Sequence, residues 1–253
     1  MSPVPRRVRR AAALTATVAL LVPLASCGGA EDRTITVLAA ASLTETFTEL
    51  ADLFERDNPG VSVELAFDSS ATLAQQAVDG APADVLATAD LATMQTARDA
   101  AADEPRPFAT NTMVLATPGD NPAGITGFAD LDRGDVTFVT CVPTAPCGKV
   151  AAALLEDNAV AAEPASLEVD VRSVLAKVTS DEADAGLVYA TDAVAAGDAV
   201  RSFDIPHAGA EVTTYPIAPL DQTSDLEEAR RFVALVRSEA GRRVLADAGF
   251  GAP

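Results

Sequence analysis

Two serines stand at positions where they can donate hydrogen bonds to a bound anion. Ser42 follows the apolar run of residues 35–41, and Ser70, with Ser69 beside it, follows the alternating run of residues 61–67. A helical pattern begins within two residues of each serine. The first amides of a helix lack intrahelical partners and lie at the positive end of the helix dipole. A serine at this place can therefore join them in an anion site that needs no cation.

Two further helices are predicted to begin in a similar way, one at Cys147 in Pro146-Cys147-Gly148 and one at Val171 after Asp170. A polar residue at the start of one helix is ordinary capping chemistry, so a single junction of this kind indicates no site. Several such junctions directed at one point would bind a dianion through neutral donors alone. The prediction of an anion site therefore depends on the combination.

The charge of the chain restricts what such a site can contain. The 253 residues include 18 Lys and Arg, 37 Asp and Glu, and a single His. Four of the arginines fall within the first ten residues, so the chain after residue 26 carries a formal net charge of −23. This negative field repels nucleic acid and anionic membrane surfaces, and it excludes a site built from a broad basic patch.

The elements that would position these residues alternate between strands and helices. Short β-rich runs predict strands at residues 34–40, 61–67, 84–87, 111–117, 136–141, 185–189 and 213–218, with a Pro-rich connection at 104–108. Amphipathic spacing predicts helices at residues 43–58, 72–78, 91–101, 147–156, 171–178, 226–237 and 241–248. Ser42 and Glu45 fit a capping box at the start of the first helix. Alternation of this kind predicts an α/β fold with parallel sheets covered by helices on both faces.

We expect two doubly wound lobes with a ligand cleft between them. Lobe one would comprise residues 33–111 plus 213–253, and lobe two residues 112–212, with the chain crossing near Asn111 and near Tyr215. Ligands of open α/β sheets lie beyond the carboxyl ends of the strands, which is where the serines stand. A cleft between two such lobes closes on its ligand by hinge motion.

The first residues are expected to form a targeting signal. Residues 1–26 combine a basic start, a short apolar run and small residues before Cys27. Leu24-Ala25-Ser26-Cys27 resembles a bacterial lipobox, in which the cysteine is lipidated and becomes the new N-terminus. The alternative is an ordinary signal peptide whose cleavage site holds a cysteine. The lipobox interpretation anchors the chain to the outer face of the cytoplasmic membrane as a lipoprotein.

Cys141 and Cys147 lie six residues apart in the part of the chain that follows the signal. In an oxidising compartment, an even pair of cysteines this close in sequence predicts a disulfide. Two thiolates and the single His207 do not supply a tetrahedral zinc site, so metal binding is the weaker interpretation of the pair.

Several blocks of the sequence resemble the periplasmic molybdate-binding proteins of ABC transporters, and the resemblance covers essentially the whole chain after the signal. The blocks are Ile-Thr-Val-Leu-Ala-Ala-Ala-Ser-Leu-Thr-Glu from residue 35, Phe-Asp-Ser-Ser-Ala-Thr-Leu-Ala-Gln-Gln from 67, Gly-Ala-Pro-Ala-Asp-Val-Leu-Ala-Thr-Ala-Asp from 80, Asp-Val-Arg from 170 and Gly-Leu-Val-Tyr-Ala-Thr-Asp-Ala from 186. The resemblance implies a fold of the type II periplasmic binding protein kind, with molybdate or tungstate as ligand and no cofactor. It also implies an ABC permease in the membrane as partner, and we expect a monomer.

In that family the oxyanion is held by two serines, two further backbone amides and a tyrosine hydroxyl. Carried over by position, the oxyanion-binding residues are Ser42, Ser70, Cys147, Val171 and Tyr189. Cys147 and Val171 would act through their amides, so a cysteine where the family often has alanine leaves the donor unchanged. All of these groups are neutral donors, which discriminate between anions by geometry and size, and none is a direct ligand of a metal cation.

Three features leave alternatives open. Ser69 could replace Ser70 as the donor, because a shift of one residue reverses which side chain faces the cleft. Asp68 beside the serines must point away from an anion or pair with a cation such as Lys149 or Arg172. Third, Cys147 would be both a disulfide partner of Cys141 and an anion-binding residue.

Two other functions compete with this one. A receptor of the same fold could bind sulfate, an organic acid or another small anion, or ferric ion through Tyr189 and Tyr215. A serine hydrolase would need His207 near Ser42 or Ser70, but His207 stands in a turn-like Pro-His-Ala-Gly segment and the sequence contains no Gly-x-Ser-x-Gly elbow. No P-loop or dinucleotide-binding glycine motif follows a strand, so we do not expect an enzyme.

Overall fold

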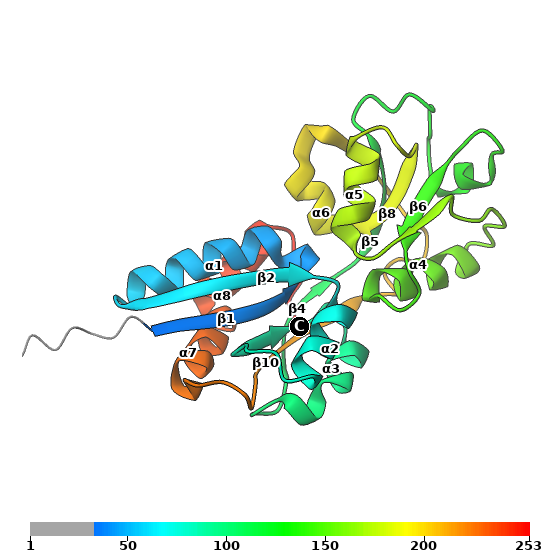
Figure 1. Ribbon diagram of the computed structural model, residues 1–253. Coiled ribbons are helices and arrows are strands. Elements are labelled where there is room, and N and C mark those ends of the chain that lie inside the picture. The colour runs from blue at the N-terminus through cyan, green and yellow to red at the C-terminus, as the bar shows by residue number, and fades with distance from the viewer. Residues whose placement is uncertain (1–32) are drawn as a thin grey trace, which may run out of the picture. The chain divides into compact units, whose positions relative to one another are not determined.

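The structure is a computed structural model that describes residues 33–253 (Figure 1). The predicted signal of residues 1–26 and the predicted lipidation site Cys27 lie outside the described residues. Asp32–Pro253 cluster as one compact unit. Within residues 33–253, none of the helices is both long and apolar enough to cross a membrane.

The first sheet has five strands in the order β2-β1-β3-β10-β4. These strands are β1 (Arg33–Ala40), β2 (Val61–Asp68), β3 (Val85–Ala87), β4 (Arg106–Asn111) and β10 (Thr213–Pro219). β1 runs parallel to both β2 and β3, whereas β10 runs antiparallel to β3 and β4. Residues 37–40 of β1 are all buried, as expected of a parallel strand that is covered on both faces.

Helices supply a core on each face of this sheet. They are α1 (Thr44–Asp57), α2 (Ser70–Val78), α3 (Leu91–Thr96), α7 (Leu226–Val236) and α8 (Glu239–Asp247), with the short 3-10 helices η1 (Ala41–Leu43) and η2 (Arg98–Ala100). Successive residues of a strand point to opposite faces, so neighbouring Val37 and Leu38 belong to different cores. In the core that holds Val37, the ring of Phe232 in α7 meets Phe47 and Phe54 of α1 edge to face.

The second sheet has the order β7-β6-β8-β5-β9. Its strands are β5 (Met113–Pro118), β6 (Phe138–Cys141), β7 (Ser166–Glu168), β8 (Ala185–Tyr189) and β9 (Val200–Asp204). The helices of this part are α4 (Pro146–Asp157), α5 (Val171–Thr179) and α6 (Ala190–Ala196), with η3 (Phe128–Asp132) and η4 (Gly197–Ala199). Gly186 of β8 faces Val174 and Val178 of α5, and an added Cβ would come within 2.8 Å of both side chains. The glycine therefore allows α5 to pack close to the sheet.

The α/β fold class expected from the sequence is confirmed, but both sheets are mixed rather than parallel. The predicted connection at residues 104–108 is wrong, because β4 begins at Arg106. Pro107 is tolerated there because β4 is an edge strand whose pairing with β10 shifts between Tyr215 and Pro216. β7, α6 and β9 were not predicted, because their segments show neither a continuous apolar run nor a helical period. The helix predicted at residues 91–101 is too long, since α3 ends at Thr96.

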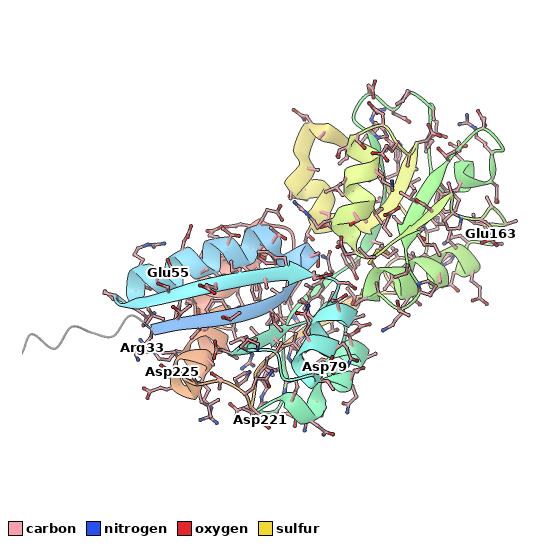
Figure 2. The ribbon with its side chains drawn as sticks, in the orientation of Figure 1. Arg33, Glu55, Asp79, Glu163, Asp221 and Asp225 are labelled. Carbon is pink, nitrogen blue, oxygen red and sulfur yellow. A yellow bond between two sulfur atoms is a disulfide. The ribbon has the colours of Figure 1, made fainter. Side chains whose placement is uncertain are left out.

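The start of the described chain is held by the C-terminal helices. Arg33 lies beside Asp225 at the start of α7 (Figure 2), with 3.7 Å between their charged groups. The same guanidinium is 2.6 Å from Glu228, and Arg231 pairs with Glu228 at 2.9 Å. Glu228 is only 1% exposed. A buried carboxylate requires such partners, so the two arginines stabilise the junction between β1 and α7.

The structure joins Cys141, at the end of β6, to Cys147, at the start of α4, in a disulfide with the two Cα atoms 5.7 Å apart. The bridge holds the first turn of α4 against the strand that precedes it.

Peptide mapping after alkylation of denatured, unreduced protein is expected to find neither Cys141 nor Cys147 modified. Replacing both by alanine should lower the free energy of unfolding by about 2 kcal/mol, because the bridge closes only a short loop in the unfolded chain. Urea unfolding of both proteins measures this difference. Two alkylated thiols in the oxidised protein would contradict the disulfide.

Candidate functional site

A cavity with an empty volume of about 220 Å³ lies where strands of both sheets end and helices begin. Its lining residues are Ala40, Ala41, Ser42, Asp68, Ser69, Ser70, Ala89, Pro146, Cys147, Asp170, Val171 and Tyr189. All five residues predicted to bind the oxyanion stand around this one cavity, and so does the alternative donor Ser69.

Ser42 lies in η1, directly after β1, and is 6% exposed. Its Oγ is 3.0 Å from the hydroxyl oxygen of the fully buried Tyr215. The capping box predicted for Ser42 and Glu45 is wrong, because α1 begins after Leu43 and the serine hydroxyl turns to the tyrosine instead. Tyr215 therefore orients Ser42, and nothing in its sequence surroundings indicated this role.

Ser70 is the first residue of α2 and is 2% exposed. The Ala89 amide donates to the Ser70 Oγ at 3.0 Å. Because an amide occupies an acceptor position of this hydroxyl, its proton remains available for donation to a guest. The Ser69 amide donates to Asp68 Oδ1 at 2.6 Å. The two cations considered as partners of Asp68, Lys149 and Arg172, are paired with Asp90 and Glu45 instead.

The remaining predicted amide donors are at the starts of α4 and α5. Cys147 is the second residue of α4 and Val171 the first residue of α5, where amides have no intrahelical partner. Gly148 lies so close to the preceding turn that an added Cβ would be 2.0 Å from the Val142 carbonyl oxygen. Only glycine permits this packing, which places the Cys147 amide at the cavity. In α5, Asp170 accepts a hydrogen bond from the Ser173 amide at 2.8 Å.

Tyr189 ends β8 and is 1% exposed. Among the residues that the structure describes, its hydroxyl has no hydrogen-bond partner. Burial raises the pKa of Tyr189 well above its ordinary value, and burial also raises the pKa of Tyr215. Both phenols therefore stay neutral, and the hydroxyl of Tyr189, a residue that lines the cavity, keeps its proton for donation.

A buried carboxyl group lies behind Tyr189. Asp192 is 1% exposed, and its Oδ2 accepts a hydrogen bond from the Tyr189 amide at 3.1 Å. Burial raises the pKa of Asp192 to about 7, although the Tyr189 amide and Arg172 oppose this, and nearby Glu45 and Asp170 add to it. Its other carboxyl oxygen has no partner within the described part of the chain. Asp192 ties the end of β8 to the start of α6.

His207 stands apart from these residues. It is exposed in the turn after β9, with a φ of 67°. The nearby Pro206 carbonyl accepts a hydrogen bond at 2.9 Å from Asn158, which follows the last residue of α4. A helix of this length spans roughly 18 Å, and the cavity lies at its other end. The structure therefore does not bring His207 to the serines.

Two α/β sheets with a pocket between their strand ends form the architecture of a binding protein for a small solute. Residues 35–251 match the model of the family described as bacterial extracellular solute-binding protein, and the chain belongs to this family.

Two kinds of comparison relate the chain to characterised proteins. Molybdate-binding protein ModA of Mycobacterium tuberculosis (strain ATCC 25618 / H37Rv) is 44% identical over 223 residues, which cover 87% of this chain and 85% of the relative. The periplasmic molybdate-binding protein of Azotobacter vinelandii is similar in structure with a TM-score of 0.77 at 20% identity, covering 87% and 99% of the two chains. The sulfate-binding protein SubI of M. tuberculosis H37Rv reaches 0.73 at 19% identity, covering 86% of each chain. The relatives are solute-binding transport proteins, and the structural matches establish the shared fold.

Asp192 should make the stability of the chain depend on pH. Its pKa is about 7 in the folded chain and about 4 in an unfolded chain, so the folded state binds the extra proton between these values. The free energy of unfolding should therefore fall as the pH rises from about 4 to 7, by up to about 4 kcal/mol from this group. In Asp192→Asn, which keeps an acceptor for the Tyr189 amide, urea unfolding at pH 5 and pH 8 should show a smaller difference. An unchanged difference would contradict the assignment.

Proposed function

We propose that the chain captures molybdate, and also tungstate, outside the cytoplasm and delivers it to an ABC importer in the membrane. The observation that carries this proposal is the cavity, around which neutral donors from both sheets gather in a strongly acidic chain. Ser42, Ser70 and Tyr189 offer hydroxyl groups, and Cys147 and Val171 offer amides at helix starts.

The chemistry of these donors fits a tetrahedral dianion. An anion that enters the cavity loses hydration, and this loss must be replaced by hydrogen bonds. Hydroxyl groups and amides supply them without changing charge at ordinary pH, and the helix dipoles add positive potential where the amides point. Molybdate and tungstate share their charge and tetrahedral shape, so one set of donors serves both.

The same observations rank the rival ligands. A relative 44% identical to the chain is named as a molybdate-binding protein, which favours molybdate over sulfate. Ferric ion prefers anionic oxygen ligands such as phenolates. Burial raises the pKa of both Tyr189 and Tyr215 and so disfavours their phenolate forms.

The surroundings of the site favour binding without catalysis. A serine hydrolase needs a base within hydrogen-bond reach of its serine, and the only histidine of the chain, His207, lies beside the far end of α4. Ser42 and Ser70 are instead held by Tyr215 and by the Ala89 amide. We infer that the chain is a receptor and has no enzyme activity.

The proposal extends to the whole chain. Residues 1–26 would act as a lipoprotein signal and Cys27 would carry the lipid, so that a monomer is held at the outer face of the cytoplasmic membrane. Residues 33–111 plus 213–253 would move as one lobe and residues 112–212 as the other. All strands of the first sheet lie within the first of these ranges and all strands of the second sheet within the other, which supports this division.

The titration that tests the function compares four anions. Molybdate or tungstate at about 100 times its Kd should stabilise the folded protein by about 2.7 kcal/mol, which corresponds to a rise in Tm of roughly 5–10 °C for a chain of this size. Sulfate and phosphate at the same concentration should give a much smaller rise. A rise with sulfate or phosphate and none with molybdate would move the chain to another receptor class.

The donors are tested one at a time by calorimetric titration with molybdate. Ser42→Ala, Ser70→Ala and Tyr189→Phe should each weaken binding by about tenfold or more, because each removes a hydrogen bond to a charged group worth roughly 1.5–3 kcal/mol. Ser69→Ala decides between the neighbouring serines and should have a smaller effect than Ser70→Ala. His207→Ala is the control and should bind as the unmodified protein does. Unchanged affinity in both Ser42→Ala and Ser70→Ala would overturn the site.

A further inference from the structure

Two ion pairs connect the helices of one sheet with those of the other at the cavity. The Lys149 ammonium in α4 is 2.9 Å from Asp90 Oδ2, at the start of α3. The Arg172 guanidinium in α5 is 2.8 Å from Glu45 Oε1 in α1. Both cations belong to elements of the second sheet, and both carboxylates belong to elements of the first.

The Lys149 pair spans the Ser70 side of the cavity. Lys149 is two residues beyond Cys147 in α4, so the pair is carried by the helix whose start offers the Cys147 amide. Asp90 directly follows Ala89, whose amide bonds to the Ser70 hydroxyl. The ion pair therefore sets the distance between an amide donor and a serine donor that belong to different sheets.

The Arg172 pair sets the corresponding distance on the Ser42 side of the cavity. Arg172 directly follows Val171, the first residue of α5. Glu45 lies three residues after Ser42, at the second position of α1. This pair joins the remaining amide donor to the remaining serine, so each predicted amide is matched with one serine across the cavity.

The cations in these pairs are not free charges for the anion. Each has a carboxylate within 3 Å that cancels most of its field at longer range. Asp90 is also fixed by its own helix, because its Oδ1 accepts a hydrogen bond from the Thr93 amide at 2.6 Å. Because Asp90 is already held in place, its pair with Lys149 chiefly fixes the position of Lys149 and of the start of α4.

We propose that the two ion pairs, Lys149 with Asp90 and Arg172 with Glu45, are positioning contacts that hold the donors of the two sheets in register around the anion and slow its release. The proposal rests on the proposed function, because it assigns a role at the same site. Release requires the two sets of donors to separate, and separation breaks both pairs. The anion enters molecules in which the pairs are transiently broken, so the pairs affect the release rate more than the association rate.

The size of the effect follows from exposure. The four side chains are between 16% and 47% exposed. Partly exposed pairs contribute little individually, so loss of one pair should speed molybdate release by about two- to fivefold, and loss of both by roughly tenfold. The effect should shrink at high ionic strength, because salt screens exposed pairs.

Stopped-flow displacement of molybdate by excess tungstate measures the release rate. Arg172→Gln and Lys149→Gln are each expected to release molybdate faster with little change in association. The matched controls remove the same charge from ion pairs that do not connect the two sheets. These pairs are Arg230 with Asp103 and Lys177 with Glu182. Arg230→Gln and Lys177→Gln should leave the release rate unchanged. Equal effects in controls and test variants would overturn the proposal.

Glu45→Gln separates positioning from simple attraction. If Arg172 acted only as a positive charge near the anion, removal of the neighbouring negative charge would slow release. If the pair positions the donors, Glu45→Gln should speed release as Arg172→Gln does, and the double variant should be no faster than either single variant. The exchanged pair Glu45→Arg with Arg172→Glu should recover part of the slow release. Slower release from Glu45→Gln would exclude the positioning role.

Failure of the proposed function gives a different result. If the unmodified protein does not bind molybdate but binds sulfate, the function is wrong, and sulfate release from the same variants then decides the positioning role. If it binds none of the four anions, small-angle scattering of the anion-free protein decides it. A larger radius of gyration in Arg172→Gln than in Arg230→Gln supports the positioning role, and equal radii overturn it.

Discussion

A strongly negative chain can hold a dianion only if the anion is shielded from that charge, and the candidate site offers uncharged donors for this purpose. The cavity lining contains serine and tyrosine hydroxyls and the first residues of helices, while Lys149 and Arg172, which closely follow lining residues in the sequence, are paired with carboxylates. Hydroxyls and amides offer their hydrogens only over short distances, so the position of each donor decides whether the anion is bound.

The fold provides the position by bringing strand ends together. β1, β2 and β3 end on one side of the cavity and β8 ends on the other, and each is followed by a helix or a turn that exposes its amides. A layer of buried polar groups stands behind these ends, where Tyr215 holds Ser42 and Asp192 holds the backbone of Tyr189. Gly148 and Gly186 allow α4 and α5 to pack closely enough for their first residues to reach the cavity. Each of these features serves placement rather than charge.

The Asp192 carboxyl shows the cost of this arrangement. Its burial raises its pKa to about 7, so the folded chain carries a partly protonated acid next to Tyr189, a predicted oxyanion-binding residue. The group is retained where it ties the end of β8 to α6, directly beside the tyrosine that faces the cavity. Burial of this carboxyl carries a desolvation cost, while its hydrogen bond fixes the backbone of Tyr189.

The sequence by itself determined the fold class, most of the helices and strands, and the places where serines and helix starts coincide, because these depend on local periodicity and turn chemistry. The serine and tyrosine positions of the candidate site were also predicted, from the sequence blocks that resemble molybdate-binding proteins. Only the tertiary structure decided that Ser42 bonds to Tyr215 rather than capping α1, and that Lys149 and Arg172 bond to Asp90 and Glu45. These partners are 59 to 173 residues apart along the chain. Their contacts arise from sheet order and strand direction, which no local pattern contains.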